Sequence, residues 1–157
     1  LKPAVDGRWL PHGQLHVTLV FLGNVSASRL PVLKALAAEV TASPITLNLD
    51  GLSVWRRSQV LCLTPSATPP ALSELTERLA SAVATASFRL ETRRYRPHLT
   101  LARQARCASQ PLRMAEPLRL RAEAFCLVES RIGPTGPAYV RLAAWPLEQS
   151  PLTPDEN

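Results

Sequence analysis

Apolar and polar positions along the chain repeat with a strand-like period of two in several short stretches and with a helical period in two longer ones. The strand-like stretches, rich in alternating apolar or β-branched residues, are 15–22, 45–49, 60–63, 88–91, 97–102, 118–130 and 139–145. The helical spacing predicts helices over about 29–42, capped by Ser26 or Ser28, and over about 70–86, after Thr68. Strands and helices mixed in this order, with short links such as residues 133–137, predict an α+β fold with largely antiparallel sheets.

The chain of 157 residues has room for one compact domain with its own core. We expect this domain to cover residues 1–148 and to be followed by a flexible, proline-containing tail over 149–157. Hydrophobic and charged fractions of 46% and 19% are those of a globular protein, so wholesale disorder is not expected. No apolar run approaches the roughly 20 residues of a membrane span. The opening LKPAVDGRW has no signal-peptide core, so we expect a cytoplasmic protein without membrane contact.

The net charge of +6 comes from 16 arginines and only two lysines against 12 acidic residues. Such an excess indicates anionic partners such as nucleotide phosphates. The same arginine bias, beside many Ala, Leu and Pro residues, is also what a GC-rich genome produces, so the charge alone decides nothing. The three cysteines are widely spaced and form no CxxC pair, so neither a zinc site nor a disulfide framework is expected.

Two of the three histidines stand in the same short pattern, in which a threonine follows two places later and apolar residues fill the positions between and after. The pattern occurs at His16-Val17-Thr18-Leu19 and at His98-Leu99-Thr100-Leu101. Side chains alternate faces along a strand, so each histidine shares a face with its threonine while the apolar neighbours face the core. If the two strands lie side by side, two imidazoles and two hydroxyls meet at one site. His12 has no such threonine and is interpreted as a loop residue.

Two imidazoles beside two hydroxyls suit the cleavage of a phosphodiester. The unperturbed imidazole pKa is about 6.5, so one ring serves as a base while the other is protonated and serves as an acid. The hydroxyls donate hydrogen bonds to phosphate oxygens as charge builds on them. This chemistry needs no metal and no other cofactor, and the sequence has no cluster of carboxylates to hold Mg²⁺. The alternative, a structural role for both histidines, is disfavoured by the doubling of the motif.

The paired motifs resemble the two H-x-T-x signatures of the 2H phosphoesterases, and 82 positions separate their histidines. The stretches LHVTLVFLGNVS and RPHLTLAR resemble the branch of RNA 2′,3′-cyclic phosphodiesterases that are also called 2′-5′ RNA ligases. The resemblance runs to about Trp145 and implies a bilobal α+β fold in which two antiparallel sheets frame a central cleft, with helices outside. It implies metal-independent hydrolysis of a 2′,3′-cyclic phosphate, on RNA ends or nucleotides, to a 2′-phosphate. We further expect a monomer.

The same resemblance assigns roles to individual residues. It makes His16 and His98 the catalytic acid and base, in an order that the near-symmetry of the motifs leaves open. It makes Thr18 and Thr100 phosphate-binding residues. It also points to a basic residue three places after the second threonine, here Arg103, which strand alternation would place on the opposite face unless the strand bends.

Other side chains have weaker claims to an RNA contact, because surface or core roles explain them equally well. Trp55 and Tyr139 are candidates for stacking on a base. Arg96, with the neighbouring arginines 89, 93, 94 and 106, is a candidate for attracting the RNA backbone. Phe21 continues the apolar register of the first motif and is expected in the core.

The sequence departs from the family pattern at its N-terminal end. A strand of the type RLFxAI and a helix, about 25 to 30 residues in all, are expected before Arg8-Trp9 and do not stand in this sequence. The absence of that strand would leave a sheet edge exposed.

Two other functions remain open at this point. One is a different 2H activity, such as cleavage or ligation of 2′-5′ oligonucleotides or hydrolysis of cyclic ADP-ribose phosphate. The other is a nucleotide- or RNA-binding module without turnover, which the presence of both histidines disfavours.

Overall fold

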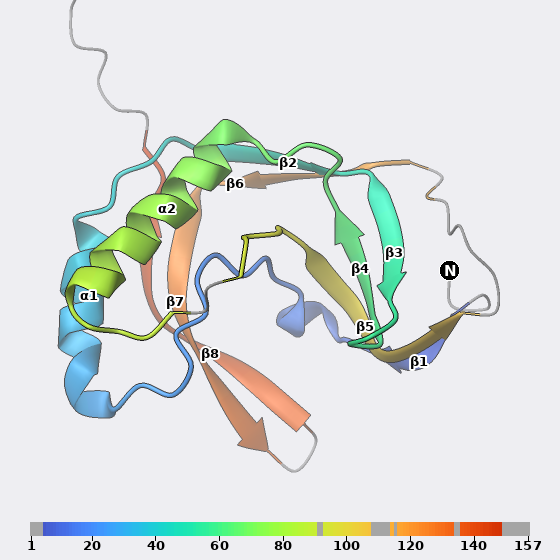
Figure 1. Cartoon of the computed structure of the whole chain (residues 1–157), viewed down its shortest axis with the longest axis horizontal. Coiled ribbons are helices and arrows are strands. Elements are labelled where there is room, and N and C mark those ends of the chain that lie inside the picture. Colours follow the sequence, from blue (N-terminus) through green and yellow to red (C-terminus); the bar gives the residue numbers. More distant parts are fainter. Residues whose placement is uncertain (1–4, 91–92, 108–113, 115, 134–135, 149–157) are drawn as a thin grey trace, which may run out of the picture.

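The computed structural model describes residues 5–90, 93–107, 114, 116–133 and 136–148 (Figure 1). Its helices are two short 3₁₀ turns, η2 (His12–Gln14) and η3 (Ala27–Arg29), and two α-helices, α1 (Leu30–Ala38) and α2 (Pro70–Thr85). Its strands are β1 (Val5–Trp9), β2 (Ile45–Leu49), β3 (Gly51–Trp55), β4 (Val60–Thr64), β5 (Leu99–Cys107), β6 (Leu118–Ala122), β7 (Ala124–Gly133) and β8 (Gly136–Pro146). Among the described residues, no helix combines the length and apolar character that crossing a membrane requires.

The strands of the described part pair only in the antiparallel sense and form three sheets. The largest has four strands in the order β1-β5-β4-β3, while β2 pairs with β6 and β7 pairs with β8. Figure 1 shows the four-stranded sheet on one side of the molecule, with the helices and the β7–β8 hairpin on the other. The α+β class with antiparallel sheets is thereby confirmed, with three sheets where two were expected.

One apolar core joins the four-stranded sheet, the β2–β6 sheet and helix α2. Leu61 and Ala102, which face each other across β4 and β5, are fully enclosed, as is Leu49 of β2. Helix α2 adds Leu75 and further apolar residues three or four positions apart, so the stripe that predicted the helix is the face it buries. Each fully buried leucine contributes about 1.5–3 kcal/mol to the stability of the fold.

A second, smaller cluster holds the two α-helices together. Leu33 of α1, Val83 of α2 and Phe88 are buried against one another. The guanidinium of Arg29 lies 3.7 Å from the centre of the Phe88 ring and donates a hydrogen bond to the carbonyl of Ala86. The start of α1 is thus tied to the end of α2. Both helices were predicted, but none of their caps is a side-chain hydrogen bond, so the expected serine and threonine caps are not formed.

The prediction of a strand over 15–22 was wrong. Only Val17 makes a ladder contact there, an isolated bridge to Leu99. A strand needs a neighbour for its backbone groups along its length, and this segment has one at a single residue. Phe21 accordingly leaves the core register, and its side chain is 62% exposed. Residues 88–90 are also irregular, after a left-handed turn at Ser87 with φ of 58°.

Other strand boundaries differ from the prediction as well. The stretch 118–130 holds two strands in different sheets, β6 and β7, since the chain bends at Glu123 between them. Strands β1 and β3 were not predicted, because each is short and contains or follows a glycine. A hydrogen bond from the Ser66 amide to Asp50, 2.7 Å long, ties the β2–β3 corner to the residues after β4. The side chain of Ser66 and then its amide lower the pKa of the Asp50 carboxyl. The expected tail over 149–157 lies outside the described residues.

Candidate active site

The two histidine–threonine motifs lie next to each other in space. Val17 of the first motif and Leu99 of the second form an antiparallel bridge. In an antiparallel pair, the residue before one partner faces the residue after the other. Each histidine therefore stands opposite the threonine of the other motif, His16 by Thr100 and His98 by Thr18.

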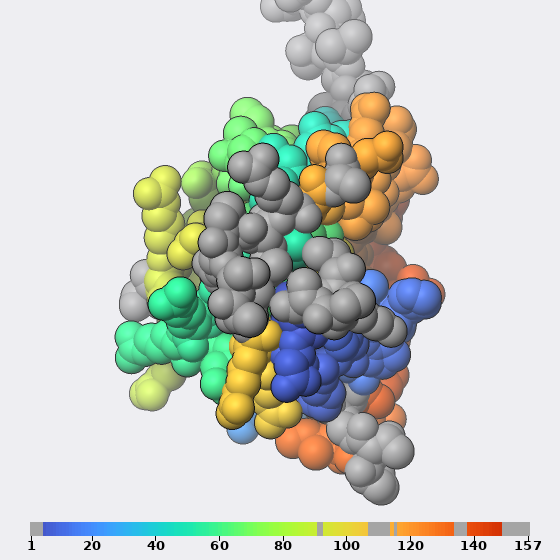
Figure 2. Space-filling view, turned by 90° about the vertical axis from the view of Figure 1, so that its right-hand side faces the viewer, coloured from blue at the N-terminus to red at the C-terminus, as the bar shows by residue number. Residues whose placement is uncertain are grey.

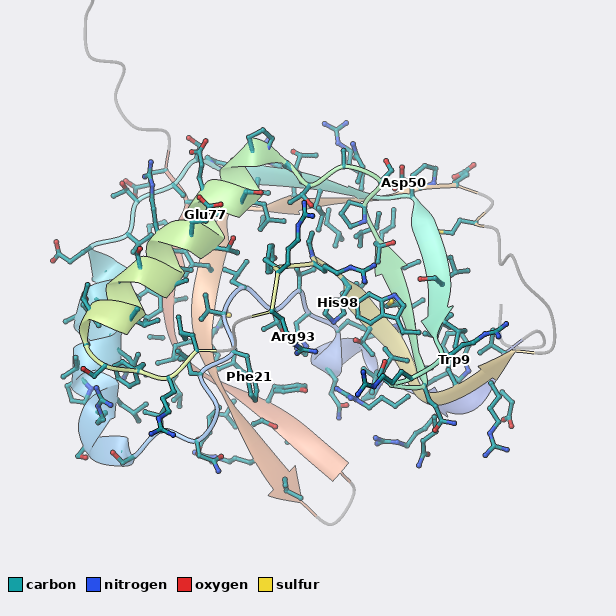
Figure 3. The ribbon with its side chains drawn as sticks, viewed as in Figure 1. Trp9, Phe21, Asp50, Glu77, Arg93 and His98 are labelled. Atoms are coloured by element: carbon teal, nitrogen blue, oxygen red, sulfur yellow. The ribbon has the colours of Figure 1, made fainter. Side chains whose placement is uncertain are left out.

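These four side chains belong to the face turned away from the core. Leu99 is buried, and Val17 packs against the same core. Side chains alternate along an extended backbone, so the histidine before and the threonine after each of these core residues point away from the core. The histidine and threonine of the second motif are half-buried, and those of the first are exposed. Figure 3 shows His98 near the middle of the molecule, where β5 begins.

Both imidazoles are held by the same kind of hydrogen bond. His16 Nδ1 lies 2.7 Å from the carbonyl oxygen of Gln14, and His98 Nδ1 lies 2.8 Å from that of Arg96. A carbonyl only accepts, so Nδ1 must carry the proton in each ring. Nε2 then has a free lone pair when the ring is neutral and an N–H when the ring is charged. Each histidine is thus oriented to act as base or acid through Nε2.

An aromatic ring packs against each histidine. The ring centres of Tyr139 and His16 are 4.7 Å apart, edge to face at 65°, and those of Trp55 and His98 are also 4.7 Å apart, at 50°. Arg96, the third residue expected to contact RNA, has its guanidinium carbon 5.1 Å from the centre of the Trp55 ring. The structure therefore brings all three to the histidines, where the aromatic rings limit how the imidazoles turn.

Arg103 lies on the same face of the sheet as Thr100, because β5 is irregular between them. Thr100 pairs with Cys62 and Ala102 with Leu61, which leaves one extra residue on β5 and marks a β-bulge. The bulge shifts the alternation by one position, so Arg103 turns to the side of Thr100 and away from the buried Ala102. Simple alternation along β5 was the wrong assumption. We call this side of the four-stranded sheet, which carries Trp55, Cys62, Thr100 and Arg103, the histidine face.

Cys62 shares the histidine face but is unsuited to be a nucleophile. It is fully buried, and burial raises the pKa of its thiol, which donates to the carbonyl of Ser53 at 3.7 Å. It is a small packing residue behind Thr100. In the part of the chain that the structure describes, no three His, Cys, Asp or Glu residues gather as metal ligands would.

Most of the chain matches the model of one known protein family. The family model described as the 2′-5′ RNA ligase superfamily matches residues 2–133, which is most of the sequence. The chain belongs to the 2′-5′ RNA ligase superfamily. The family expectation raised by the paired motifs is thereby confirmed.

Curated proteins of the superfamily are similar to the chain over much of its length. The RNA 2′,3′-cyclic phosphodiesterase of Escherichia coli (strain K12) is 37% identical over 103 residues, covering 66% of this chain and 58% of that protein. The Bacillus subtilis (strain 168) protein of the same name is 32% identical over 102 residues, covering 62% of this chain and 55% of that protein. The chain spans little more than half the length of these relatives.

Solved structures of the superfamily have the same fold. E. coli LigT complexed with 3′-AMP superposes with a TM-score of 0.86 at 32% identity, over 95% of this chain and 85% of that one. A protein of Thermus thermophilus, TT0787, matches with a TM-score of 0.72 at 26% identity, over 94% and 85% of the two chains. These matches confirm the α+β fold of the 2H phosphoesterases.

Sequence reasoning missed several features that shape the site of this superfamily member. The carbonyls of Gln14 and Arg96 hold the imidazoles, and no sequence pattern marks a backbone acceptor. Strand β1, which brings Arg8 beside Arg103, was also missed. The alternation of Val5, Gly7 and Trp9 was a weak signal for it, and the repeat Ala-Arg-Gln-Ala-Arg over 102–106 was a signal for the irregularity of β5.

Proposed function

We propose that the chain hydrolyses 2′,3′-cyclic phosphates on RNA ends or nucleotides, with His16 and His98 as the catalytic pair. The observation that carries the proposal is the bridge between Val17 and Leu99, which sets the imidazole of each motif opposite the threonine hydroxyl of the other. The curated relatives named RNA 2′,3′-cyclic phosphodiesterase support the choice of substrate. The structure of a relative complexed with 3′-AMP supports a nucleotide ligand.

The proposed reaction is a single displacement at phosphorus. Nε2 of one histidine takes a proton from water, and the water oxygen attacks the phosphorus. The bond from phosphorus to O3′ breaks, and Nε2–H of the other histidine protonates O3′, so the phosphate stays on O2′. We assign His98 as the base and His16 as the acid. After one turnover the two rings have exchanged protonation states, and solvent restores them.

Three further residues are proposed to hold the phosphate. The hydroxyls of Thr18 and Thr100 donate to its non-bridging oxygens, on which charge grows in the transition state. The guanidinium of Arg103, turned to the histidine face by the bulge, adds a positive charge. Together these groups supply the stabilisation that a metal ion provides in other phosphodiesterases.

The aromatic residues are proposed to contact the nucleotide as well as the histidines. Trp55 and Tyr139 are each half-exposed, so part of each ring is open to stack on a base or ribose. Arg96, over the Trp55 ring, is proposed to approach the RNA backbone. The proposal also retains a monomer acting in the cytoplasm; light scattering or analytical ultracentrifugation tests the first and fractionation of cells the second.

The decisive experiment is incubation with a 2′,3′-cyclic mononucleotide, followed by phosphorus NMR of the product. We expect the 2′-phosphate isomer, and we expect EDTA to leave the rate unchanged. Loss of activity with EDTA and rescue by Mg²⁺ or Mn²⁺ would reject the two-histidine mechanism. A pure 3′-phosphate product would refute only the choice of leaving group.

A second substrate tests which histidine is the acid. In an analogue with sulfur in place of O3′, the leaving group is a good one and needs no proton. His16→Ala should regain most of its activity on this analogue, while His98→Ala should stay slow. The reverse result would exchange the two assignments.

A further inference from the structure

Strand β5 has two irregularities, and the second lies beyond the catalytic motif. The first bulge leaves Leu101 as the extra residue against β4. At the second, the register with β1 shifts between Asp6 and Arg8, and Gln104 takes a left-handed conformation with φ of 53°. A bulge adds one residue to one strand. Because the two bulges of β5 lie three residues apart, side chains that face the same side recur every three residues there instead of every two.

The period of three sorts the side chains of β5 into two rows. Leu99, Ala102 and Ala105 form the inner row, all of them buried at 6% exposure or less. Thr100, Arg103 and Arg106 form the outer row on the histidine face, where both arginines are exposed. The phosphate-binding threonine is therefore the first member of a row whose next two members are cations.

Strand β1 adds a third cation beside this row. Arg8 pairs directly with Arg103, and like charges placed opposite each other on neighbouring strands destabilise a sheet. The guanidinium groups of these two arginines and of Arg106 make no hydrogen bond or ion pair with any other described residue. Asp6 is the cross-strand partner of Arg106 but forms no ion pair with it among the described residues. Three guanidinium groups and a single carboxylate thus face solvent here, and an external polyanion would stabilise this excess of positive charge.

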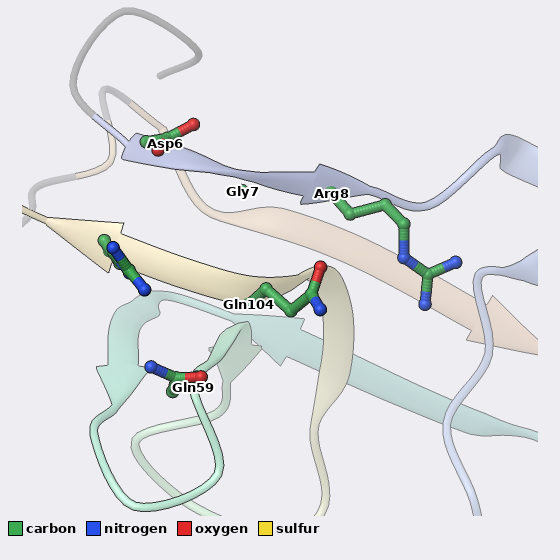
Figure 4. Close-up of a pocket in the computed structure, with 6 residues that line it drawn as sticks. Asp6, Gly7, Arg8, Gln59 and Gln104 are labelled. Carbon is green, nitrogen blue, oxygen red and sulfur yellow. The ribbon is translucent and has the colours of Figure 1, made fainter.

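The row ends at a pocket between β1, β5 and the β3–β4 turn. Its volume is about 390 Å³, and its lining is mainly polar: Asp6, Gly7, Arg8, Gln59, Gln104 and Arg106 (Figure 4). Glycine is needed at position 7, since a Cβ there would lie 3.0 Å from the Cα of Ala105 and 3.2 Å from the Arg103 carbonyl. Figure 2 shows β1, β5 and the β3–β4 turn side by side on one surface of the molecule.

We propose that Arg103, Arg8 and Arg106 form a track for the RNA strand that precedes the terminal nucleotide, with backbone phosphates bound by Arg8 and Arg106 at the pocket that both arginines line. The inference rests on the proposed function, because the track begins where the cyclic phosphate would sit. In RNA with a terminal 2′,3′-cyclic phosphate, both the 2′ and 3′ oxygens are in the ring, so the strand continues only through the 5′ oxygen. The rest of the RNA therefore leaves the active site in one direction, and a single track is enough to bind it. The preferred substrate is therefore an oligonucleotide rather than a mononucleotide.

The test compares kcat/KM for a 2′,3′-cyclic mononucleotide with that for oligoribonucleotides of about two to six residues ending in the same group. For the wild-type protein we expect kcat/KM to rise with length and then level off. Arg8→Gln and Arg106→Gln should each lower the ratio of long-substrate to mononucleotide kcat/KM by about 3- to 10-fold. Each should also flatten the slope of log kcat/KM against log salt by about 0.7 for the long substrate.

Two controls separate the track from general charge. Arg106→Lys keeps the cation and should retain the wild-type salt slope. Arg119→Gln removes an exposed arginine of β6, in another sheet, and should leave the ratio unchanged. A length-independent wild-type kcat/KM, or equal effects of Arg106→Gln and Arg119→Gln, would overturn the track.

Failure of the proposed function gives a different result. If the wild-type protein hydrolyses none of the substrates, the activity is refuted, and anisotropy of a labelled oligoribonucleotide still measures the track. Weaker binding by Arg8→Gln and Arg106→Gln than by Arg119→Gln would then support the track, and equal binding would refute it.

Discussion

The two copies of the histidine–threonine motif have the same sequence pattern, but the backbone of the second is held by a sheet and that of the first is not. The second copy runs into β5, where Leu99 and Thr100 pair with β4 and the residues from Ala102 onward pair with β1 as well. Pro97 and Leu99, on either side of His98, are buried. The first copy lies in a segment whose only ladder contact among the described residues is the bridge at Val17.

The position of His16 instead depends on contacts from several separate elements. The η2 turn places the Gln14 carbonyl under its Nδ1, and hydrogen bonds from the Gln14 and Leu15 amides to Pro11 and His12 close that turn. Tyr139 of β8 packs on its ring. The proposed chemistry therefore needs two equivalent imidazoles but not two equivalent scaffolds. We call the region around His16 the first half of the site and the region around His98 the second half. Substitutions that remove the chemistry should affect both halves alike, and substitutions that remove structural contacts should affect them differently.

The largest expected effect is the same in both halves. His16→Ala and His98→Ala should each lower kcat/KM for a cyclic mononucleotide by about 10²- to 10⁴-fold, because each removes one of two proton transfers. The double variant should be little worse than either single one, since the pair acts as a unit. His12→Ala is the matched control and should be nearly silent. Full activity in either single variant would refute the two-histidine mechanism.

The threonines should show a smaller effect of the same kind. Thr18→Val and Thr100→Val keep the shape of the side chain and remove the hydroxyl, so each should lower kcat/KM by about 10- to 1000-fold. Thr85→Val, at the end of α2, is a control for the substitution itself. Unchanged kinetics in both motif variants, with native circular dichroism spectra, would show that the hydroxyls do not touch the phosphate.

Several elements of the fold could be predicted from the spacing of apolar residues along the chain. The stretch that contains the first motif could not, and the difference has a physical reason. Helix α2 and strand β2 were predictable from the spacing of their apolar residues, because each buries one regular stripe. Strand β4 was predictable as a short continuous apolar run, because both of its faces are buried. The stretch 15–22 has equally strong strand character but no continuous partner. Whether a neighbouring strand is present is a tertiary property, and propensity does not report it.

The site was predictable to the level of the repeated motif and no further. Finding one histidine–threonine pattern twice was enough to bring four residues together and to name the family. The side on which Arg103 lies depends on a bulge, and a one-residue shift reverses every later position of a strand. The contacts of Tyr139 and Trp55 with the imidazoles join strands that are far apart in the chain, and no spacing rule reaches that far.

The aromatic partners should separate the two halves. Because the backbone of His16 has little sheet support, Tyr139→Ala should lower kcat by about 10- to 30-fold, whereas Trp55→Ala should lower it about 3-fold. Tyr139→Phe keeps the ring and should restore kcat if the ring positions the imidazole. A loss confined to KM in either alanine variant would instead indicate stacking on the nucleotide. Equal losses of kcat would contradict the idea that β5 holds His98 independently.

The smallest expected effect lies in the approach to the second motif, where Tyr95 packs against the core with its hydroxyl buried. That hydroxyl has no hydrogen-bond partner among the described residues, and burial raises its pKa to about 12. Tyr95→Phe should therefore leave the free energy of unfolding at pH 8 unchanged or raise it by up to about 1 kcal/mol. In the wild-type protein the free energy of unfolding should fall as the pH rises from about 10 towards 12, because the unfolded tyrosine ionises first. Urea titrations of both proteins at several pH values measure this, and the fall should be smaller in the variant. A marked loss of stability at pH 8 would show that the hydroxyl is bonded after all, and that the second motif is held by more than apolar packing and its strand.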